Sequence, residues 1–240
     1  MKRDELPEVL FKKMEEVRPY PDGVKEVENM LDKTAFFPGG KGLWLEDNSK
    51  DFPDILVLGQ DFSTVKIYDD MMKGTKADLD SQTWKNLIKL FNEANLDLNK
   101  CYFSNVFMGL RDSNKMTGEF PGFKDKDFAD RNLEFLLFQI EIIKPRLIIT
   151  LGKYAAEMIT NIAETGLDSW KNFGALRTPN IGLKPNVSFN KHYCICVALE
   201  HTSFRHVNVK RRVHENYNGH EAEIEMLKDA LRLMYGKGTF

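Results

Sequence analysis

The amino-acid sequence predicts an α/β protein built on a parallel central sheet. Two stretches, Asp54–Leu58 and Arg146–Leu151, contain continuous apolar runs of branched side chains, which are typical of strands buried on both faces. Each run stops at a glycine, Gly59 or Gly152, where the backbone can turn without a Cβ penalty. Amphipathic helical patterns lie between the strand candidates, and this alternation favours a parallel sheet.

The first 50 residues predict a helical extension packed on the rest of the chain. Leu6, Leu10 and Met14 fall at helical spacing and predict a helix over Glu5–Val17. A second short helix is expected over Val24–Leu31. The glycine-rich stretch Gly39–Gly42 lacks the spacing of a phosphate-binding loop, so we interpret it as a turn-rich entry to the first core strand.

The turn after the first strand carries the most informative polar residues. Gln60, Asp61 and Ser63 follow Gly59 directly, at the carboxyl end of a predicted parallel strand, where open α/β sheets bind their ligands. Asp61 is therefore a candidate catalytic carboxylate. The alternative is that Asp61 caps a following turn or helix.

The middle of the chain adds a second strand with a polar residue at its end. Residues 64–80 are polar and predict a long loop, and a helix follows around Trp84. The short aromatic run Cys101–Val106 predicts a strand with Asn105 at its carboxyl end, beside Asp61 if the two strands are neighbours. Asn105 as a simple turn former is the alternative. Another loop is expected over residues 109–126, and a long helix is expected over Asp127–Ile143.

The last third predicts the third and fourth strands. After Arg146–Leu151 a helix is expected over Lys153–Ile162, and residues 167–191 are loop-like with room for short strands. The fourth strand, His192–Leu199, leads directly to His201. A basic stretch then precedes a final helix, and such stretches are commonly solvated faces. The helix is expected over Glu221–Met234, and no interdomain linker interrupts the chain, so we expect one domain over residues 1–240.

Composition narrows the classes of function. The formal net charge is −2 and the pI about 6.2, so a nucleic-acid surface would have to be local. Three cysteines, Cys101, Cys194 and Cys196, cannot all pair in disulfides and match no metal-site spacing, which favours structural thiols in a reducing, cytoplasmic setting. No long uncharged apolar run predicts a membrane span, and neither a metal nor an organic cofactor is expected.

Four short motifs, in this order, resemble those of the uracil-DNA glycosylase superfamily. Gly59-Gln60-Asp61-Phe62-Ser63 is similar to the G-Q-D-P-Y motif, and Ser104-Asn105-Val106 is similar to the segment with the strand-end asparagine. Lys144–Lys153 resembles the K-P-x-x-[IV]-[IV]-x-L-G segment, and His201-Thr202-Ser203 resembles H-P-S. Together the motifs cover about residues 53–212. The resemblance implies a three-layer α/β/α fold with a central parallel four-stranded sheet and a base pocket at its strand ends.

The resemblance also implies roles for individual residues. Asp61 would orient or activate water, Asn105 would read the Watson–Crick edge of a flipped base, and His201 would hydrogen-bond the base carbonyl that gains charge. The remaining expected base contacts are Gly59, Gln60 and Phe62. The expected contacts to DNA phosphates are Ser63, Ser203, Arg205, Lys210 and Arg211.

The sequence departs from the family pattern at several positions. Phe62 and Ser63 replace the proline and tyrosine of the first motif, and Thr202 replaces the proline of the last. The expected stacking aromatic is missing near Gly74, and Tyr68 or Trp84 could substitute for it. The four-cysteine iron–sulfur branch is excluded because its amino-terminal cysteine pair is absent. A divergent member is therefore expected.

These observations lead to one main hypothesis and two alternatives. The main hypothesis is a monomeric DNA glycosylase that removes uracil or a related deaminated base from single- or double-stranded DNA in base-excision repair. The first alternative is a non-catalytic module that binds a nucleobase or nucleic acid. The second is a hydrolase of free nucleosides, which the mild acidity of the chain would suit.

Overall fold

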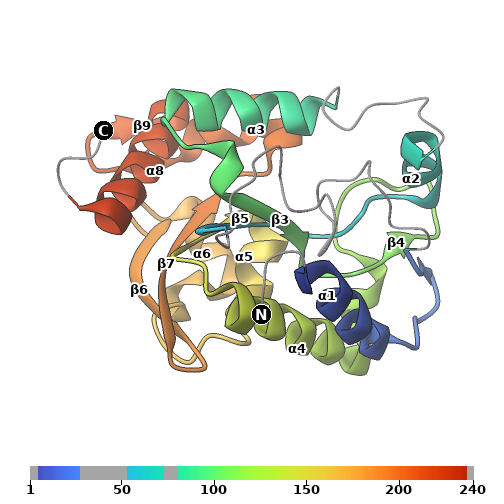
Figure 1. Ribbon diagram of the computed structural model, residues 1–240. Coiled ribbons are helices and arrows are strands. Elements are labelled where there is room, and N and C mark those ends of the chain that lie inside the picture. The colour runs from blue at the N-terminus through green and yellow to red at the C-terminus, as the bar shows by residue number, and fades with distance from the viewer. Residues whose placement is uncertain (1–4, 28–52, 73–80, 237–240) are drawn as a thin grey trace.

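A five-stranded sheet forms the centre of the computed structural model, which describes residues 5–27, 53–72 and 81–236 (Figure 1). Four strands are parallel, as predicted, and a fifth at the edge, which the sequence did not predict as part of the sheet, is antiparallel to its neighbour. In spatial order the strands are β3 (Cys101–Asn105), β2 (Ile55–Gly59), β5 (Leu147–Leu151), β7 (His192–Leu199) and β6 (Leu183–Phe189).

The edge strand β6 accounts for the difference from the predicted four strands. Pro185 and Asn186 are exposed in its middle, and its register with β7 shifts between Lys184 and Val187. Proline is tolerated on an edge strand because its missing N–H faces no neighbouring strand. The same proline gave this segment its loop-like pattern.

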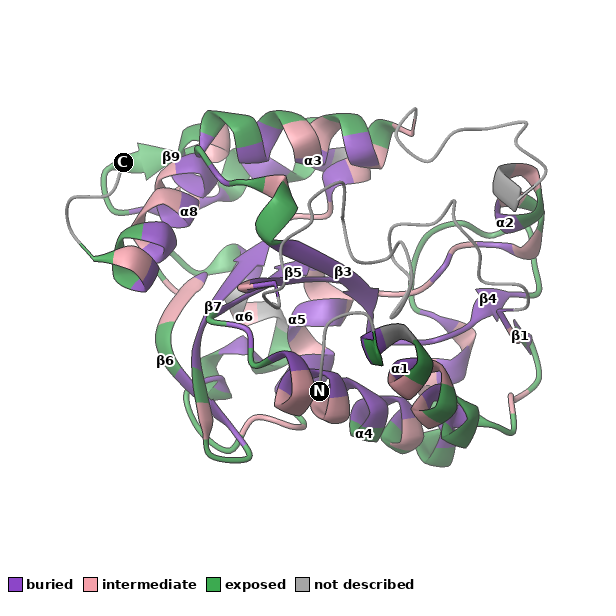
Figure 2. Ribbon diagram, in the orientation of Figure 1, coloured by how far each residue is buried: buried purple, intermediate pink, exposed green. Residues whose placement is uncertain are grey.

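Helices cover both faces of the sheet and complete three layers. Alternate residues of β2 point to opposite sides: Leu56 and Leu58 join one apolar cluster, Ile55 and Val57 the other. Figure 2 shows the parallel strands mostly buried between these layers, whereas part of the edge strand β6 is exposed. The first cluster packs against α1 (Leu6–Met14), α4 (Lys126–Ile143) and α5 (Lys153–Ile159), and the second against α3 (Gln82–Glu93) and α8 (Gly219–Tyr235).

Local signals define the ends of the long helices. The Asp125 side chain accepts a hydrogen bond from the backbone N–H of Phe128 at 2.8 Å and caps α4. Lys144 takes a left-handed conformation, and Pro145 follows, so α4 ends there. Ser81 caps α3 by accepting from the backbone N–H of Trp84 at 3.3 Å.

Three local predictions are wrong within the described residues. Val24 and Lys25 form strand β1 instead of starting a helix, because they pair with the antiparallel strand β4 (Leu110–Arg111), which occupies part of the predicted loop 109–126. Part of the predicted loop after Asp61 is helix α2 (Val65–Met72). Residues 28–31 of the predicted helix, the glycine-rich stretch Gly39–Gly42 and residues 73–80 lie outside the described residues.

The remaining elements are short. They comprise helices α6 (Gly174–Arg177) and α7 (Arg205–Asn208), the hairpin strands β8 (Val213–His214) and β9 (Tyr217–Asn218), and 3₁₀ turns at Glu15–Val17, Leu98–Lys100, Pro121–Lys124, Asp168–Phe173, Thr202–Phe204 and Val209–Arg211. The three cysteines are buried and free. In the described parts of the chain no helix is both long and apolar enough to cross a bilayer.

Candidate active site

The carboxyl ends of the parallel strands bring the predicted polar residues to one edge of the sheet. Gly59 and Asn105 are paired in register at the ends of β2 and β3. The pairing continues beyond the strands, because the backbone N–H of Phe107 donates to the carbonyl oxygen of Gln60 at 2.9 Å. His201 follows β7 two residues after Leu199, which pairs with Leu151 at the end of β5.

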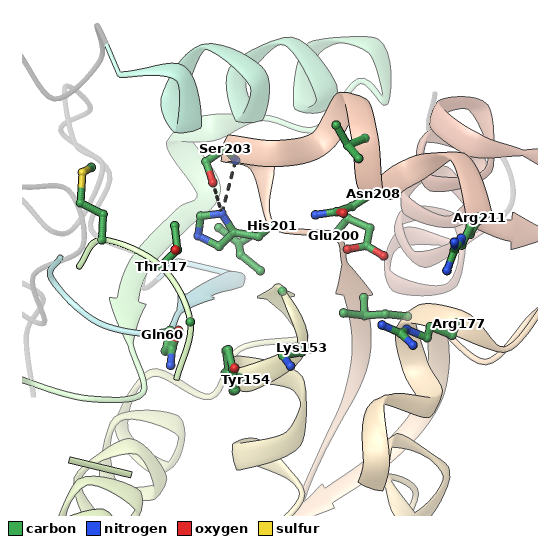
Figure 3. Close-up of a pocket in the computed structure, with 16 residues that line it drawn as sticks. Gln60, Thr117, Lys153, Tyr154, Arg177, Glu200, His201, Ser203, Asn208 and Arg211 are labelled. Atoms are coloured by element: carbon green, nitrogen blue, oxygen red, sulfur yellow. Dashed lines mark hydrogen bonds between the residues drawn. The ribbon is translucent and has the colours of Figure 1, made fainter. Parts of the chain in front are cut away.

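A cavity of about 570 Å³ opens at this edge (Figure 3). Four residues predicted from the sequence line it: Gln60, His201, Ser203 and Arg211. The other lining residues are Met116, Thr117, Gly118, Leu151, Gly152, Lys153, Tyr154, Leu176, Arg177, Glu200, Val207 and Asn208.

The His201 imidazole is held in one tautomer by the turn that follows it. Its Nδ1 accepts a hydrogen bond from the backbone N–H of Ser203 at 3.3 Å, and the Ser203 hydroxyl lies 2.7 Å from the same nitrogen. A backbone N–H can only donate, so Nδ1 is the acceptor and the hydroxyl donates to it as well. The neutral ring therefore carries its proton on Nε2, which is the arrangement of a hydrogen-bond donor.

A glycine makes room for this ring. Gly152 has φ of +87°, and a Cβ built there would lie 3.1 Å from the Cβ of His201. A side chain at position 152 would thus be strained and would press on the histidine. The glycine that ends β5 is therefore part of the site, although the sequence analysis assigned it only to a turn.

Burial lowers the pKa of His201 below its ordinary value of 6.5, and the negative charge of Asp61 offsets part of that shift. His201 is therefore neutral at pH 7. The influence of Asp61 also shows that the carboxylate lies within electrostatic range of the ring.

The lowered pKa predicts a pH-dependent stability. Below pH 6.5 the unfolded chain binds a proton at His201 more readily than the folded protein, so the free energy of unfolding falls as the pH drops from 6.5 through the lowered pKa. The contribution to the slope is at most about 1.4 kcal/mol per pH unit. Urea unfolding between pH 7.5 and 5 should show a shallower pH dependence in His201→Gln than in the wild type. Equal slopes would contradict the assignment.

Gln60 lines the cavity, but its amide nitrogen lies inside the protein. Its Nε2 is buried and has no hydrogen-bond partner among the described residues. An unpaired buried amide costs about 1–3 kcal/mol.

The Asp61 carboxylate lies in an ion pair and does not line the cavity. Arg111 donates from Nη2 to Oδ2 at 2.7 Å and from Nε to Oδ1 at 3.2 Å. Oδ1 also accepts from the backbone N–H of Ser63 at 2.8 Å, in a turn where Ser63 has φ of +71°. The two charged side chains are only 3% and 7% exposed for Arg111 and Asp61. Sequence reasoning missed Arg111, whose partner stands 50 positions earlier.

Most of the other expected base contacts are packed inside the protein. Asn105 is buried at the end of β3 and is 1% exposed. Phe62 and Tyr68 pack edge to face with ring centroids 6.5 Å apart in the first apolar cluster. Trp84 packs on Phe103 in the second cluster, on the other face of the sheet. None of these residues lines the cavity.

Among the described residues, Tyr154 supplies a phenol ring to the cavity lining. The Nζ of Lys153 lies 4.4 Å from its ring centroid. Its position two residues after Gly152, at a strand end, is the signal that could have identified it.

The basic stretch divides into buried and exposed halves. Arg205 is ion-paired with Glu223 and donates to Nδ1 of His220, and Arg212 lies 3.2 Å from the Glu223 carboxylate. Because both guanidinium groups are buried and paired, the expected contact between Arg205 and a DNA phosphate does not fit its position. Lys210 and Arg211 are exposed, and their expected contacts with DNA phosphates stay predictions.

A second carboxyl group, Glu200, lies at the cavity beside His201. Burial raises its pKa above 4.5, and the Glu223 carboxylate raises it further, while three arginines oppose the shift. Its backbone N–H donates to Oε1 of Glu223 at 2.7 Å. Across the described residues, no group of three or more histidine, cysteine, aspartate or glutamate side chains is placed to hold a metal ion.

The fold and the cavity define an α/β protein with a candidate ligand site at the carboxyl ends of its parallel strands. A family model described as the uracil DNA glycosylase superfamily matches residues 53–228. The chain therefore belongs to the uracil DNA glycosylase superfamily. A search of curated proteins found no matching relative.

Proposed function

We propose that the protein is a DNA glycosylase that hydrolyses the N-glycosidic bond of uracil or a related deaminated base. Family membership gives the general class. The observation that supports the reaction most strongly is His201, a neutral imidazole fixed by Ser203 as an Nε2–H donor at the cavity. Such a donor stabilises the negative charge that develops on a base as it leaves as an anion.

In the proposed reaction the bond between the base nitrogen and C1′ breaks first. The bonding electrons go to the base, and the negative charge that develops on its carbonyl oxygen accepts a hydrogen bond from His201. The deoxyribose becomes oxocarbenium-like, and a water oxygen adds to C1′. Asp61 holds that water and accepts its proton, and the base anion is protonated on release. Asn105, the expected reader of the base edge, is buried at the end of β3 and does not line the cavity, so it takes this role only if the base passes beyond the cavity to the end of β3.

The surface around the cavity supports contacts with nucleic acid. Arg177 and Arg211 are exposed cavity-lining residues from two separate elements. Lys210 extends the same basic surface. Guanidinium groups suit phosphate oxygens, so these side chains are placed to hold a DNA backbone while a base enters the cavity. Ser203, in contrast, contributes by orienting His201.

One observation favours the alternative of a non-catalytic nucleobase-binding module. Both oxygens of the Asp61 carboxylate already bond Arg111, and Asp61 does not line the cavity. A paired carboxylate stabilises a developing positive charge less than a free one does. The Nε2–H of His201 would still donate to a carbonyl group.

A panel of oligonucleotides tests the proposal. We expect free base to be released from single- or double-stranded DNA carrying uracil, hypoxanthine or xanthine. We also expect the affinity for that DNA to fall with salt, with a log–log slope of about −0.7 to −0.9 per phosphate contact. Release from free nucleosides with no salt dependence would instead indicate a nucleoside hydrolase, and binding without release would indicate the binding module.

A further inference from the structure

We infer that Arg111 is a positioning residue that joins the Asp61 turn and the cavity wall at Thr117–Glu119 into one unit. The inference rests on the proposed function only for its activity readout. The Arg111 guanidinium group donates hydrogen bonds to both Asp61 and Gly118, which are more than 50 positions apart in the sequence.

All five N–H groups of the Arg111 side chain have partners. Nε and one N–H of Nη2 bond the Asp61 carboxylate, as described above. The other N–H of Nη2 donates to the carbonyl oxygen of Gly118 at 2.8 Å, and Nη1 donates to those of Glu119 at 3.2 Å and Thr117 at 3.5 Å. A planar fork with five donors can make this set of bonds, whereas a lysine ammonium with three cannot.

The backbone of Arg111 is anchored to the same turn. Its N–H donates to the carbonyl oxygen of Ser63 at 2.8 Å, and it forms a bridge with Thr64. Its guanidinium carbon lies 5.6 Å from the centroid of the Phe120 ring. Main chain and side chain together therefore connect the turn after β2 with residues 117–120.

The connection matters because the wall itself is exposed. Residues 112–119 are all exposed, and Met116, Thr117 and Gly118 line the cavity. Arg111, at 2% exposure, and Phe120, at 0%, are the buried residues at the two ends of this exposed segment. Loss of the guanidinium fork would release three carbonyl groups at once, and the cavity would lose its shape on that side.

The same bonds determine how many acceptor positions of the Asp61 carboxylate remain available to a water molecule or a substrate. An ionised carboxylate has about four acceptor positions. Arg111 and Ser63 together take both positions of Oδ1 and one of Oδ2. One acceptor position of Oδ2 remains, enough for a single water molecule or substrate hydroxyl in a direction that Arg111 fixes.

Cleavage by trypsin after Lys115 tests the connection without any need for activity. Lys115 is exposed in the wall segment, and cleavage there reports how often the segment opens. Both Asp61→Asn and Arg111→Lys are expected to speed cleavage at least about tenfold. The first variant is the sharper test, because Asp61 contacts the wall only through the Arg111 guanidinium in the bonds described above.

Arg131→Lys is the matched control. Arg131 also donates to two backbone carbonyls, those of Val17 and Pro19, and lies over an aromatic ring, but on α4 away from the cavity. It should leave cleavage after Lys115 unchanged. In an active protein Arg111→Lys should also raise the KM for lesion DNA about tenfold or more, whereas a loss of folded protein alone would lower only the apparent kcat.

Two results would overturn the inference. One is unchanged cleavage in Asp61→Asn, which would mean that the turn and the wall are independent. The other is wild-type resistance in Arg111→Lys, which would mean that a positive charge suffices and the fork is not needed. Both can be read even if no lesion is ever released, so failure of this inference is distinguishable from failure of the proposed function.

Discussion

Replacing His201 by alanine is expected to lower kcat for base release about 10²- to 10³-fold, the effect of removing one donor from a developing oxyanion. The structure supplies the reason: Ser203 fixes the tautomer that carries a proton on Nε2, and burial keeps the ring neutral. Single-turnover release of free base, measured at saturating enzyme, checks the expected loss.

His206→Ala is the matched control for that substitution. His206 is an exposed histidine five positions further along the same segment and does not line the cavity. It should retain the wild-type rate. Because the His201 side chain also caps the turn at Thr202–Phe204, thermal unfolding of both variants must be compared. Equal rates in the wild type and a folded His201→Ala protein would remove His201 from the mechanism.

Replacing Glu223 by glutamine is expected to reduce the free energy of unfolding by about 3–5 kcal/mol, because it leaves buried charges without their partner. The Glu223 side chain is fully buried on α8 and faces Arg205 and Arg212, which are themselves 6% and 4% exposed. It also accepts the backbone N–H of Glu200. Urea unfolding at pH 7 measures the loss.

Glu225→Gln, on the same helix, is the control for Glu223→Gln. Glu225 pairs with Lys228 and Arg232 in partly exposed contacts, which contribute about 0–1 kcal/mol. A loss at Glu223 no larger than the loss at Glu225 would show that the buried cluster does not hold the segment after His201 in place.

The parts of the fold that were predicted correctly depend on local patterns. The strands β2 and β5 were visible because a strand buried on both faces is an uninterrupted apolar run, and β3 and β7 were visible as a short aromatic run and a mostly apolar run. Their parallel order then places Asp61, Asn105 and His201 at one edge. The strand β6 was missed because an exposed edge containing Pro185 has no such run.

The parts of the site that could not be predicted depend on partners distant in the sequence. Arg205 belongs to a basic run, but its burial is decided by Glu223, 18 positions later on another helix. The ion pair of Asp61 with Arg111 spans 50 positions. The residue types of Tyr68 and Trp84 suit a stacking contact with a base, but their packing places both side chains in the core. Sequence periodicity carries no information about such pairings.

The most direct test of the proposed glycosylase is the release of free base by the wild type and by Asp61→Asn under single-turnover conditions, on the lesion that the oligonucleotide panel identifies as the fastest. We expect the wild type to release that base and Asp61→Asn to be slower by about 10²-fold or more. If no lesion is released while lesion DNA or free uracil still binds, the protein is not a glycosylase for these bases, and the cavity is a binding site.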